Sequence, residues 1–399
     1  MNLAAVRFRD FRIYLIGNIF ALNGLWMQRL TIGWIAWELT ESASFVGLVA
    51  FINFAPTIFA GPFFGVLVDR IRIRRAALIT QSVLFVLAIM LFVSFSAGLL
   101  GVALLAIVSG VLGTVMAAHN PIRMSLAPRL VDRSAIASVI SLTAINFNLA
   151  RLSGPALAGW LITSCGVGAS LLIQALFYLP FILALSILRP RERTRTKERA
   201  APFFQDMAVG VRHVLRTPLI RQALFVTGVS AFISRGVLEI LPVVAGGAFD
   251  KGATGLGLLT AAAGLGALIA GISKALLPGQ TSGQLPSIAL VSAVVGTALV
   301  PAIGFSGFWP LTLLLVACLG FAATMTGVSM QTAIQVDLED DLRGRVMSLW
   351  VLVGIGSAAS GAVFLGALTD LTGIAAALSW AGGFGVLFLA IYIRRNWKP

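Results

Sequence analysis

The sequence predicts an all-α polytopic membrane protein, with twelve transmembrane helices in two six-helix bundles related by a pseudo-two-fold axis along the membrane normal. Of the 399 residues, 58% are hydrophobic and only 11% are charged, whereas soluble proteins carry about 25% charged residues. The apolar residues form long blocks, as helices that cross a hydrocarbon core of about 30 Å require. The strands of a membrane β-barrel would instead alternate over about 10 residues.

Charged and turn residues divide the chain into twelve apolar blocks long enough to span a membrane. The blocks cover approximately residues 11–38, 43–68, 76–96, 99–122, 135–163, 167–188, 218–247, 254–276, 285–304, 309–335, 346–370 and 374–393.

The connections between these blocks alternate in charge. One set is basic and includes Arg7, Arg9, Arg12, Arg70, Arg72, Arg74, Arg75, Arg123, Arg129, Arg133, Lys274, Arg343, Arg345, Arg394, Arg395 and Lys398. The other set contains a single basic residue, Lys251. By the positive-inside rule this asymmetry predicts that both termini are cytoplasmic. It also explains the net charge of +14 without a nucleic-acid partner.

The longest polar stretch divides the chain into three parts. We expect an N-terminal six-helix bundle over residues 1–188, a cytoplasmic linker with an amphipathic helix over 189–217, and a C-terminal six-helix bundle over 218–399. The segment FFQDMAVGVRHVL in the linker suits a helix at the membrane surface. A tether that orients the halves and a regulatory element are both compatible with it.

The two predicted bundles resemble each other in sequence. Arg29 and Arg235 are 206 residues apart, and the segments LSGPALAG and ASGAVFLG are 207 residues apart. The basic connections LVDRSAIASV and DDLRGRVMSL match at an offset of 209. An even number of spans per repeat gives both halves the same orientation. This is the parallel-repeat arrangement of transporters, whose substrate site lies between the halves.

The segment GPFFGVLVDRIRIRRAAL, residues 61–78, joins two predicted spans at their cytoplasmic ends. Gly65 permits close helix approach, while Asp69 and Arg70 suit charge pairs that break between conformations. The segment resembles the G-x-L-a-D-R-x-G-R-[RK] signature of the major facilitator superfamily. Arg74 also matches, although Arg72 and Ile73 replace the usual Gly and Arg. We assign gating to this group and to two arginines of the second half, Arg343 and Arg345.

The segment LARLSGPALAGWL resembles an element of exporters in the same superfamily, G-P-x-x-x-G, which is associated with antiport. Gly154, Pro155 and Gly159 supply its pattern and permit a helix bend. The resemblance covers the whole chain and is closest to the branch that includes the enterobactin exporter and macrolide-efflux proteins. It implies an efflux protein of the bacterial inner membrane.

Four charged residues lie inside predicted spans: Arg29, Arg151, Arg235 and Glu239. Intramembrane charges are costly, and they are usually paired or functional. Arg235 and Glu239 share a helix face at a spacing of four. They form either a structural ion pair or a proton-coupling pair in which Glu239 exchanges the proton.

Arg29 and Arg151 have no carboxylate within a helical turn. Either they reach the membrane interface, or they line the cavity that the resemblance implies. Three arginines against one glutamate favour an acidic ligand. Further binding candidates are Gln28, Asn53, Asn146, Asn148 and the apolar wall residue Trp26. His119 either carries a proton or is simply hydrogen-bonded.

The sequence offers nothing that an enzyme would need. It contains no G-x-x-x-x-G-K-[ST] segment for nucleotide binding, and its two histidines, His119 and His213, are far apart. Cys165 and Cys318 lack metal-ligand spacing. We therefore expect no cofactor and no metal.

The sequence favours a proton-coupled exporter of an amphipathic or acidic small molecule, working as a monomer among membrane lipids. Its partners would be the substrate, protons and lipids. A lipid or lysolipid flippase on the same fold and a non-transporting receptor or assembly protein remain alternatives. No motif encodes direction, so an importer is also compatible.

Overall fold

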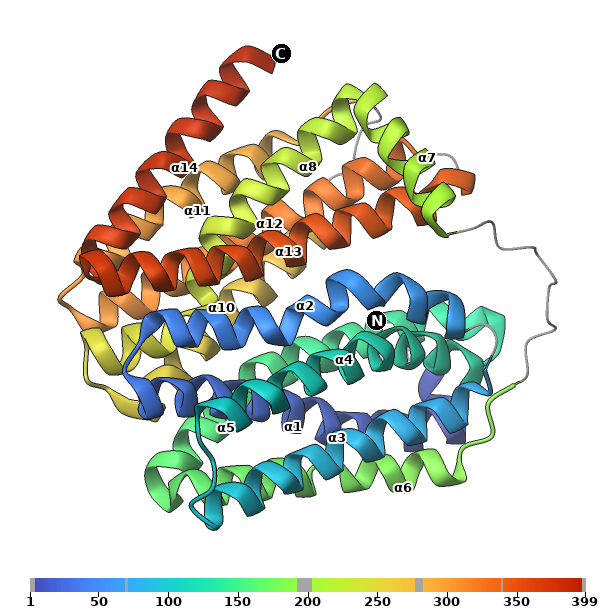
Figure 1. Cartoon of the computed structure of the whole chain (residues 1–399). Helices are drawn as coiled ribbons and strands as arrows, with labels where there is room; N and C mark the ends of the chain where they lie inside the picture. The colour runs from blue at the N-terminus through green and yellow to red at the C-terminus, as the bar shows by residue number, and fades with distance from the viewer. Residues whose placement is uncertain (1–3, 69–70, 192–202, 277–282, 339, 397–399) are drawn as a thin grey trace. The chain divides into compact units, whose positions relative to one another are not determined.

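The computed structural model describes residues 4–68, 71–191, 203–276, 283–338 and 340–396, which are almost entirely helical (Figure 1). No β-strand occurs within these ranges. The chain forms two compact units. Unit 1 comprises Met1–Glu41, Ile52–Thr196 and Lys251–Ala261, and unit 2 comprises Ser42–Phe51, Lys197–Asp250 and Ala262–Pro399.

Unit 1 is built around a long first helix. Its elements are η1 (Ala4–Arg7), α1 (Arg9–Thr40), most of α2 (Ala43–Val68), α3 (Ile73–Ser96), α4 (Val102–Leu126), η2 (Ala127–Leu130), η3 (Arg133–Ala135), α5 (Ile136–Leu176), α6 (Leu179–Ile187) and the start of α10 (Gly252–Leu276). Helix α1 packs along α5 and α6, while α3 packs against α4. Gly17 brings α1 close to α6, because a Cβ atom there would lie 3.0 Å from the Phe181 Cα. Gly24 brings α1 close to the end of α5, because a Cβ atom there would lie 2.9 Å from the Gln174 carbonyl oxygen.

Unit 2 contains a more broken set of helices. They are α7 (Phe203–Arg216), α8 (Pro218–Ser230), the π-helix η4 (Ala231–Arg235), α9 (Gly236–Glu239), the π-helix η5 (Val243–Ala248), the rest of α10, α11 (Ser287–Phe305), α12 (Trp309–Val336), α13 (Asp340–Thr372) and α14 (Ile374–Asn396). Helix α11 packs against α12 and α14, and α13 packs against η4 and α9.

Nine helical segments of the described chain are long and apolar enough to cross a membrane. Three features separate this number from the twelve predicted spans. The 32-residue helix α1 is not among the nine. Residues 133–187 count once, although Gly166 breaks the helix at φ 85° in the predicted connection. Residues 218–248 are divided into short α- and π-helical pieces. The protein is a multi-pass membrane protein, and twelve spans remain a prediction.

The charge-poor connections are tight turns. Five of the six contain a residue with positive φ, namely Glu41, Gly98, Gly166, Asp250 with Gly252, and Gly373. At the end of α1, for example, the left-handed Glu41 donates its backbone N–H to the Trp37 carbonyl oxygen over 2.7 Å. Such a left-handed residue ends a helix and reverses the chain within a few residues.

Two helix beginnings pack closely on a long helix of the same unit. In unit 2 the start of α2 lies on α13, where a Cβ atom at Gly366 would overlap the Ala43 carbonyl group. In unit 1 the start of α10 lies on α5, where a Cβ atom at Gly159 would lie 2.6 Å from the Ala253 carbonyl oxygen. Gly159 and Gly366 are 207 residues apart. The two contacts therefore recur at the spacing of the sequence repeat.

The linker segment forms the expected helix, α7. Its Val214 is 9% exposed and belongs to the apolar core of unit 2. At Gly210 the helix approaches Arg345 of α13, since a Cβ atom there would lie 3.2 Å from the Arg345 Cβ. Helix α7 is thus anchored on unit 2 by an apolar face.

Candidate functional site

Two of the predicted intramembrane arginines meet around one tryptophan in unit 1. The Arg29 Cζ atom lies 5.3 Å from the centre of the Trp26 ring, and the Arg151 Cζ atom lies 5.8 Å from it. Arg29 also lies 4.8 Å from the Phe54 ring centre. Phe147 packs edge-on against Trp26 at 5.7 Å. We call Trp26, Arg29, Phe54, Phe147 and Arg151 the arginine–tryptophan cluster.

Helical spacing and one glycine build this cluster. Trp26 and Arg29 are three residues apart on α1, and Phe147 and Arg151 are four apart on α5, so each pair shares a helix face. Gly154 brings the two faces together, because a Cβ atom there would lie 2.7 Å from the Trp26 Cβ. Beside it, Ser153 Oγ donates a hydrogen bond to Asn23 Oδ1 over 2.7 Å.

The cluster has the chemistry to bind an acidic aromatic molecule. Both guanidinium groups lie within the distance of about 6 Å at which a ring attracts a cation, and both arginines are half-buried. A guanidinium can also bind a carboxylate through two parallel hydrogen bonds. Trp26 Nε1 is buried and has no hydrogen-bond acceptor within the described part of the chain. An acceptor on a ligand would satisfy it.

Three of the four predicted amides are engaged elsewhere. Gln28 is buried, and its Oε1 accepts a hydrogen bond of 2.6 Å from the Tyr178 hydroxyl. Asn53 Nδ2 donates to the Ser109 carbonyl oxygen over 3.3 Å, and Asn148 Nδ2 donates to its own helix at Ala144 over 2.9 Å. Asn146 is buried in α5. A binding role for these four residues remains a prediction.

Arg235 and Glu239 occupy a distorted helix in unit 2. Arg235 is the last residue of the π-helix η4 and is exposed, while Glu239 ends α9 and is half-buried. The adjacent Ser234 is buried, and its Oγ has no hydrogen-bond partner among the described residues. π-helical turns are rare and frequently occur at functional sites. Pairing between Arg235 and Glu239 stays a prediction.

His119 belongs to a buried polar group that sequence reasoning missed. Its Nδ1 lies 2.9 Å from the Thr80 hydroxyl. Asn18, Gln81 and Arg123 line the same cavity of about 10 Å³, which is room for about one water molecule. Within the described ranges, both amide atoms of Asn18 and Nε2 of Gln81 lack hydrogen-bond partners. Asn18 and Gln81 are isolated amides in apolar helices, like the amides that the sequence analysis names as candidates.

The structure describes only part of the predicted gate. Asp69 and Arg70 lie outside the described residues, and so do the surroundings of Gly65 in α2. Arg74 Nη1 donates a hydrogen bond of 2.8 Å to the Leu188 carbonyl oxygen. Arg343 and Arg345 lie in the first turns of α13.

The predicted bend elements are buried in α5. Pro155 lies inside the helix, and its carbonyl oxygen would be 2.9 Å from a Cβ atom at Gly257 of α10. Gly154 and Gly159 serve the close packing described above. The break of α5 falls later, at Gly166.

A second feature missed from the sequence is a carboxylate at the end of α13. Asp370 accepts hydrogen bonds from Ser42 Oγ over 2.7 Å, from the Ala43 N–H over 2.8 Å and from the Ser44 N–H over 2.9 Å. It thereby satisfies two unpaired N–H groups at the N-terminus of α2. A carboxylate in a turn sequence gives no signal that it caps a distant helix.

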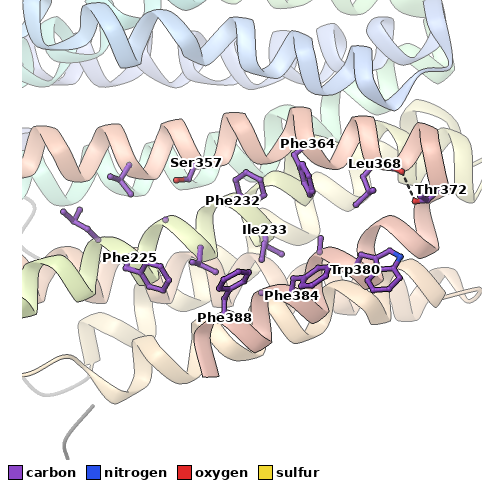
Figure 2. A pocket seen from close by; sticks show the side chains of 16 residues that line it. Phe225, Phe232, Ile233, Ser357, Phe364, Leu368, Thr372, Trp380, Phe384 and Phe388 are labelled. Carbon is purple, nitrogen blue, oxygen red and sulfur yellow. Dashed lines mark hydrogen bonds between the residues drawn. The ribbon is translucent and has the colours of Figure 1, made fainter. Parts of the chain in front are cut away.

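A cavity lined mostly by apolar side chains lies in unit 2 (Figure 2). It has a volume of about 950 Å³ and lies between α8 with η4, α13 and α14. Six aromatic side chains line its walls: Phe225, Phe232, Phe364, Trp380, Phe384 and Phe388. Arg235 and Glu239 are not part of its lining. We call this cavity the apolar groove.

The helical architecture and the long apolar helices are those of a multi-pass membrane protein. Its fold resembles that of solved membrane transporters. The nucleoside transporter NupG matches with a TM-score of 0.77, at 12% identity, over 98% of this chain and 100% of that one. A bacterial homologue of the human lysosomal transporter Spinster, inward-facing and unoccupied, matches with a TM-score of 0.63 at 15% identity, over 98% and 99% of the two chains.

Residues 1–398 match the family model described as transmembrane secretion effector, and the chain belongs to this family. Members of the superfamily are transporters rather than enzymes. The enterobactin exporter EntS of Shigella boydii serotype 18 is 27% identical over 282 residues, and that of Escherichia coli O139:H28 is 26% identical over 282 residues. These alignments cover 68% of this chain and 63% of each relative's length.

Proposed function

We propose that the protein is a secondary active exporter that moves an acidic, amphipathic small molecule out of the cytoplasm in exchange for protons. It would act as a monomer in a bacterial inner membrane, with both termini cytoplasmic. Its bundles, residues 1–188 and 218–399, would supply twelve spans and alternate access to a central site. The arginine–tryptophan cluster is the observation that carries this proposal.

The side chains of the arginine–tryptophan cluster support an acidic substrate. Arg29 and Arg151 offer two positive charges beside one indole ring, and Trp26 Nε1 offers a donor. A substrate with an aromatic ring and an acidic group uses all three. The similarity to enterobactin exporters supports a siderophore-like or drug-like molecule.

Replacing Arg29 tests the cluster directly. Arg29→Gln removes a charge-assisted hydrogen bond worth about 1.5–3 kcal/mol, so the apparent affinity for an anionic aromatic substrate should fall by about tenfold or more. A neutral ester of the same molecule should lose much less. Uptake into inside-out vesicles measures both, with the exposed Arg133→Gln as the matched control. Equal losses for the acid and its ester would assign Arg29 a structural role.

Proton coupling is proposed for Glu239, with Arg235 as its counter-ion and His119 as a second proton carrier. In proteoliposomes, Glu239→Gln should abolish the stimulation of transport by a pH gradient while leaving substrate exchange intact. The exposed Glu38→Gln is the control. If Glu239→Gln keeps full gradient-driven transport, Glu239 has no coupling role and the pair is structural.

Gating is proposed for two of the basic connections. Asp69 with Arg70 and Arg74, and Arg343 with Arg345 in the second half, would hold the cytoplasmic ends of the bundles in one conformation. Gly65 would permit close helix packing beside them. The helix-bend role of Gly154, Pro155 and Gly159 belongs to the same cycle.

A lipid flippase on the same fold is the second candidate, and the apolar groove is the observation that favours it. Fluorescent phospholipid in the same proteoliposomes separates the two functions. Lipid translocation without substrate-dependent proton movement would favour the flippase. Failure of both assays would favour the non-transporting receptor.

A further inference from the structure

The apolar groove of unit 2 has the shape of a slot. Its lining on α13 runs from Val353 to Thr372, a rise of about 28 Å at 1.5 Å per residue. That length matches the hydrocarbon core of a bilayer, about 30 Å. Thr372 Oγ1 bonds to its own helix at the Leu368 carbonyl oxygen over 2.8 Å (Figure 2). A long apolar slot suits an extended acyl chain.

The aromatic side chains that α14 contributes to the groove are exposed. In Figure 2 the aromatic side chains of α14 point toward those of η4 and α13 across the groove. Trp380, Phe384 and Phe388 are each more than half exposed in the structure. Within a membrane span, such surfaces contact lipid.

One end of the groove carries positive charge. On α14 the lining residues Trp380, Phe384 and Phe388 recur every four residues, and the same stripe continues to Tyr392 and Arg395. On α8, Arg221 precedes the lining residue Phe225 by four. Arg221 Nη1 donates a hydrogen bond to the Leu215 carbonyl oxygen over 3.2 Å. The Phe225 and Tyr392 rings stack at 4.0 Å. Two arginines therefore flank the point where the apolar lining ends.

We propose that the groove holds one anionic phospholipid, with an acyl chain along the aromatic walls and the phosphate at Arg221 and Arg395. Charge complementarity selects the headgroup, since a basic residue near an anionic lipid surface contributes about 1 kcal/mol. The bound lipid would fill the space that α14 leaves open beside α8 and α13.

The test measures lipid binding by native mass spectrometry of the purified full chain. Phosphatidylglycerol and phosphatidylcholine with identical acyl chains are titrated separately into delipidated protein. The wild type should bind one phosphatidylglycerol more tightly than phosphatidylcholine. Arg395→Gln and Arg221→Gln should each weaken phosphatidylglycerol binding by about fivefold and leave phosphatidylcholine binding unchanged.

Arg394→Gln is the matched control, because Arg394 neighbours Arg395 but lies on another face of α14. It should change phosphatidylglycerol binding by less than twofold. Equal losses at positions 394 and 395 would overturn the proposal, as would equal binding of both lipids by the wild type. These exposed positions do not depend on core packing.

A variant that fills the groove tests whether the groove holds the acyl chain. Ser357→Phe adds bulk to the groove wall and should reduce retention of both lipids. Retention unchanged in a monodisperse Ser357→Phe protein would exclude the groove as the acyl site. A lipid-free dimer of the wild type that Ser357→Phe dissociates would instead identify a second copy of the chain as the occupant.

Discussion

The two units bury different kinds of polar side chain. Among the described residues, unit 1 buries five amides and one histidine: Asn18, Gln28, Gln81, Asn146, Gln174 and His119. In the described part of unit 2, the buried polar side chains are all serines and threonines. The comparison separates an interior that holds amides and a histidine from one whose polar side chains are hydroxyls.

The difference lies in how each group finds a partner. A buried hydroxyl can bond within its own helix, as Thr227 Oγ1 does to the Ala223 carbonyl oxygen over 2.7 Å and Thr297 Oγ1 to Ala293 over 3.0 Å. A buried amide has more hydrogen-bonding atoms and needs tertiary partners. Unit 1 therefore carries polar groups that its fold only partly satisfies, and the proposed substrate chemistry lies there.

The two units also differ in the continuity and packing of their helices. In unit 1, helix α1 is continuous and meets α6 closely at Gly17. In unit 2, residues 218–248 are interrupted by two π-helices, and α14 leaves the apolar groove beside them. One contact is nevertheless shared. Gly154 packs on α1 and Gly361 packs on η4, 207 residues apart.

The largest loss of stability is expected from a variant that disrupts this shared glycine contact. A Cβ atom at Gly361 would overlap the Phe232 carbonyl group, so Gly361→Ala should destabilise the protein by about 3 kcal/mol. Gly154→Ala should cost less, because the nearest atom to its Cβ, the Trp26 Cβ, would lie at 2.7 Å, whereas at Gly361 the Phe232 carbonyl oxygen would lie at 1.9 Å. Thermal unfolding in a mild detergent measures both.

The control for this prediction lies in the same helix. A Cβ atom at Gly354 of α13 would meet nothing within 4 Å, so Gly354→Ala should be neutral or stabilising by up to about 1 kcal/mol. Similar melting temperatures for the alanine variants at positions 354 and 361 would refute the packing argument.

Much of the fold follows from the sequence, for a simple reason. Apolar blocks must become helices in a membrane, because backbone groups have no other partner there. The predicted block 43–68 and helix α2, Ala43–Val68, have the same bounds. The two π-helices were not predictable, since the segment around Arg235 reads as one continuous apolar block. Tertiary packing sets such local distortions.

Part of the arginine–tryptophan cluster could be recognised from the sequence. Arg29 and Arg151 stand out in the sequence because a charge in an apolar block is conspicuous, and the structure brings both to Trp26. Asp370 and Asn18 do not stand out. Their significance depends on which helix ends and side chains face them, and no local pattern carries that information.

A second prediction compares the two helix beginnings that pack on a long helix. Asp370→Asn removes the charge that caps α2 and should cost about 1–2 kcal/mol. In unit 1, Thr254 of α10 makes a neutral contact instead, donating to Thr163 Oγ1 over 2.6 Å. Thr254→Val should therefore cost about 1 kcal/mol or less. A larger loss for Thr254→Val in thermal unfolding would contradict this ranking.

The smallest expected change in stability concerns Asn18, and it tests the meaning of the polar interior. Asn18 is fully buried, and both its amide atoms lack partners in the described chain. Replacing a buried unsatisfied group by an apolar one of similar shape is nearly neutral or stabilising. Asn18→Leu should therefore raise the free energy of unfolding by up to about 1 kcal/mol.

If unit 1 retains this amide for the transport cycle, the same variant should lose gradient-driven transport. Leu84→Ile, a conservative change in the same cavity wall, controls for altered packing. A more stable Asn18→Leu protein with full transport would show that the buried amides do not serve function.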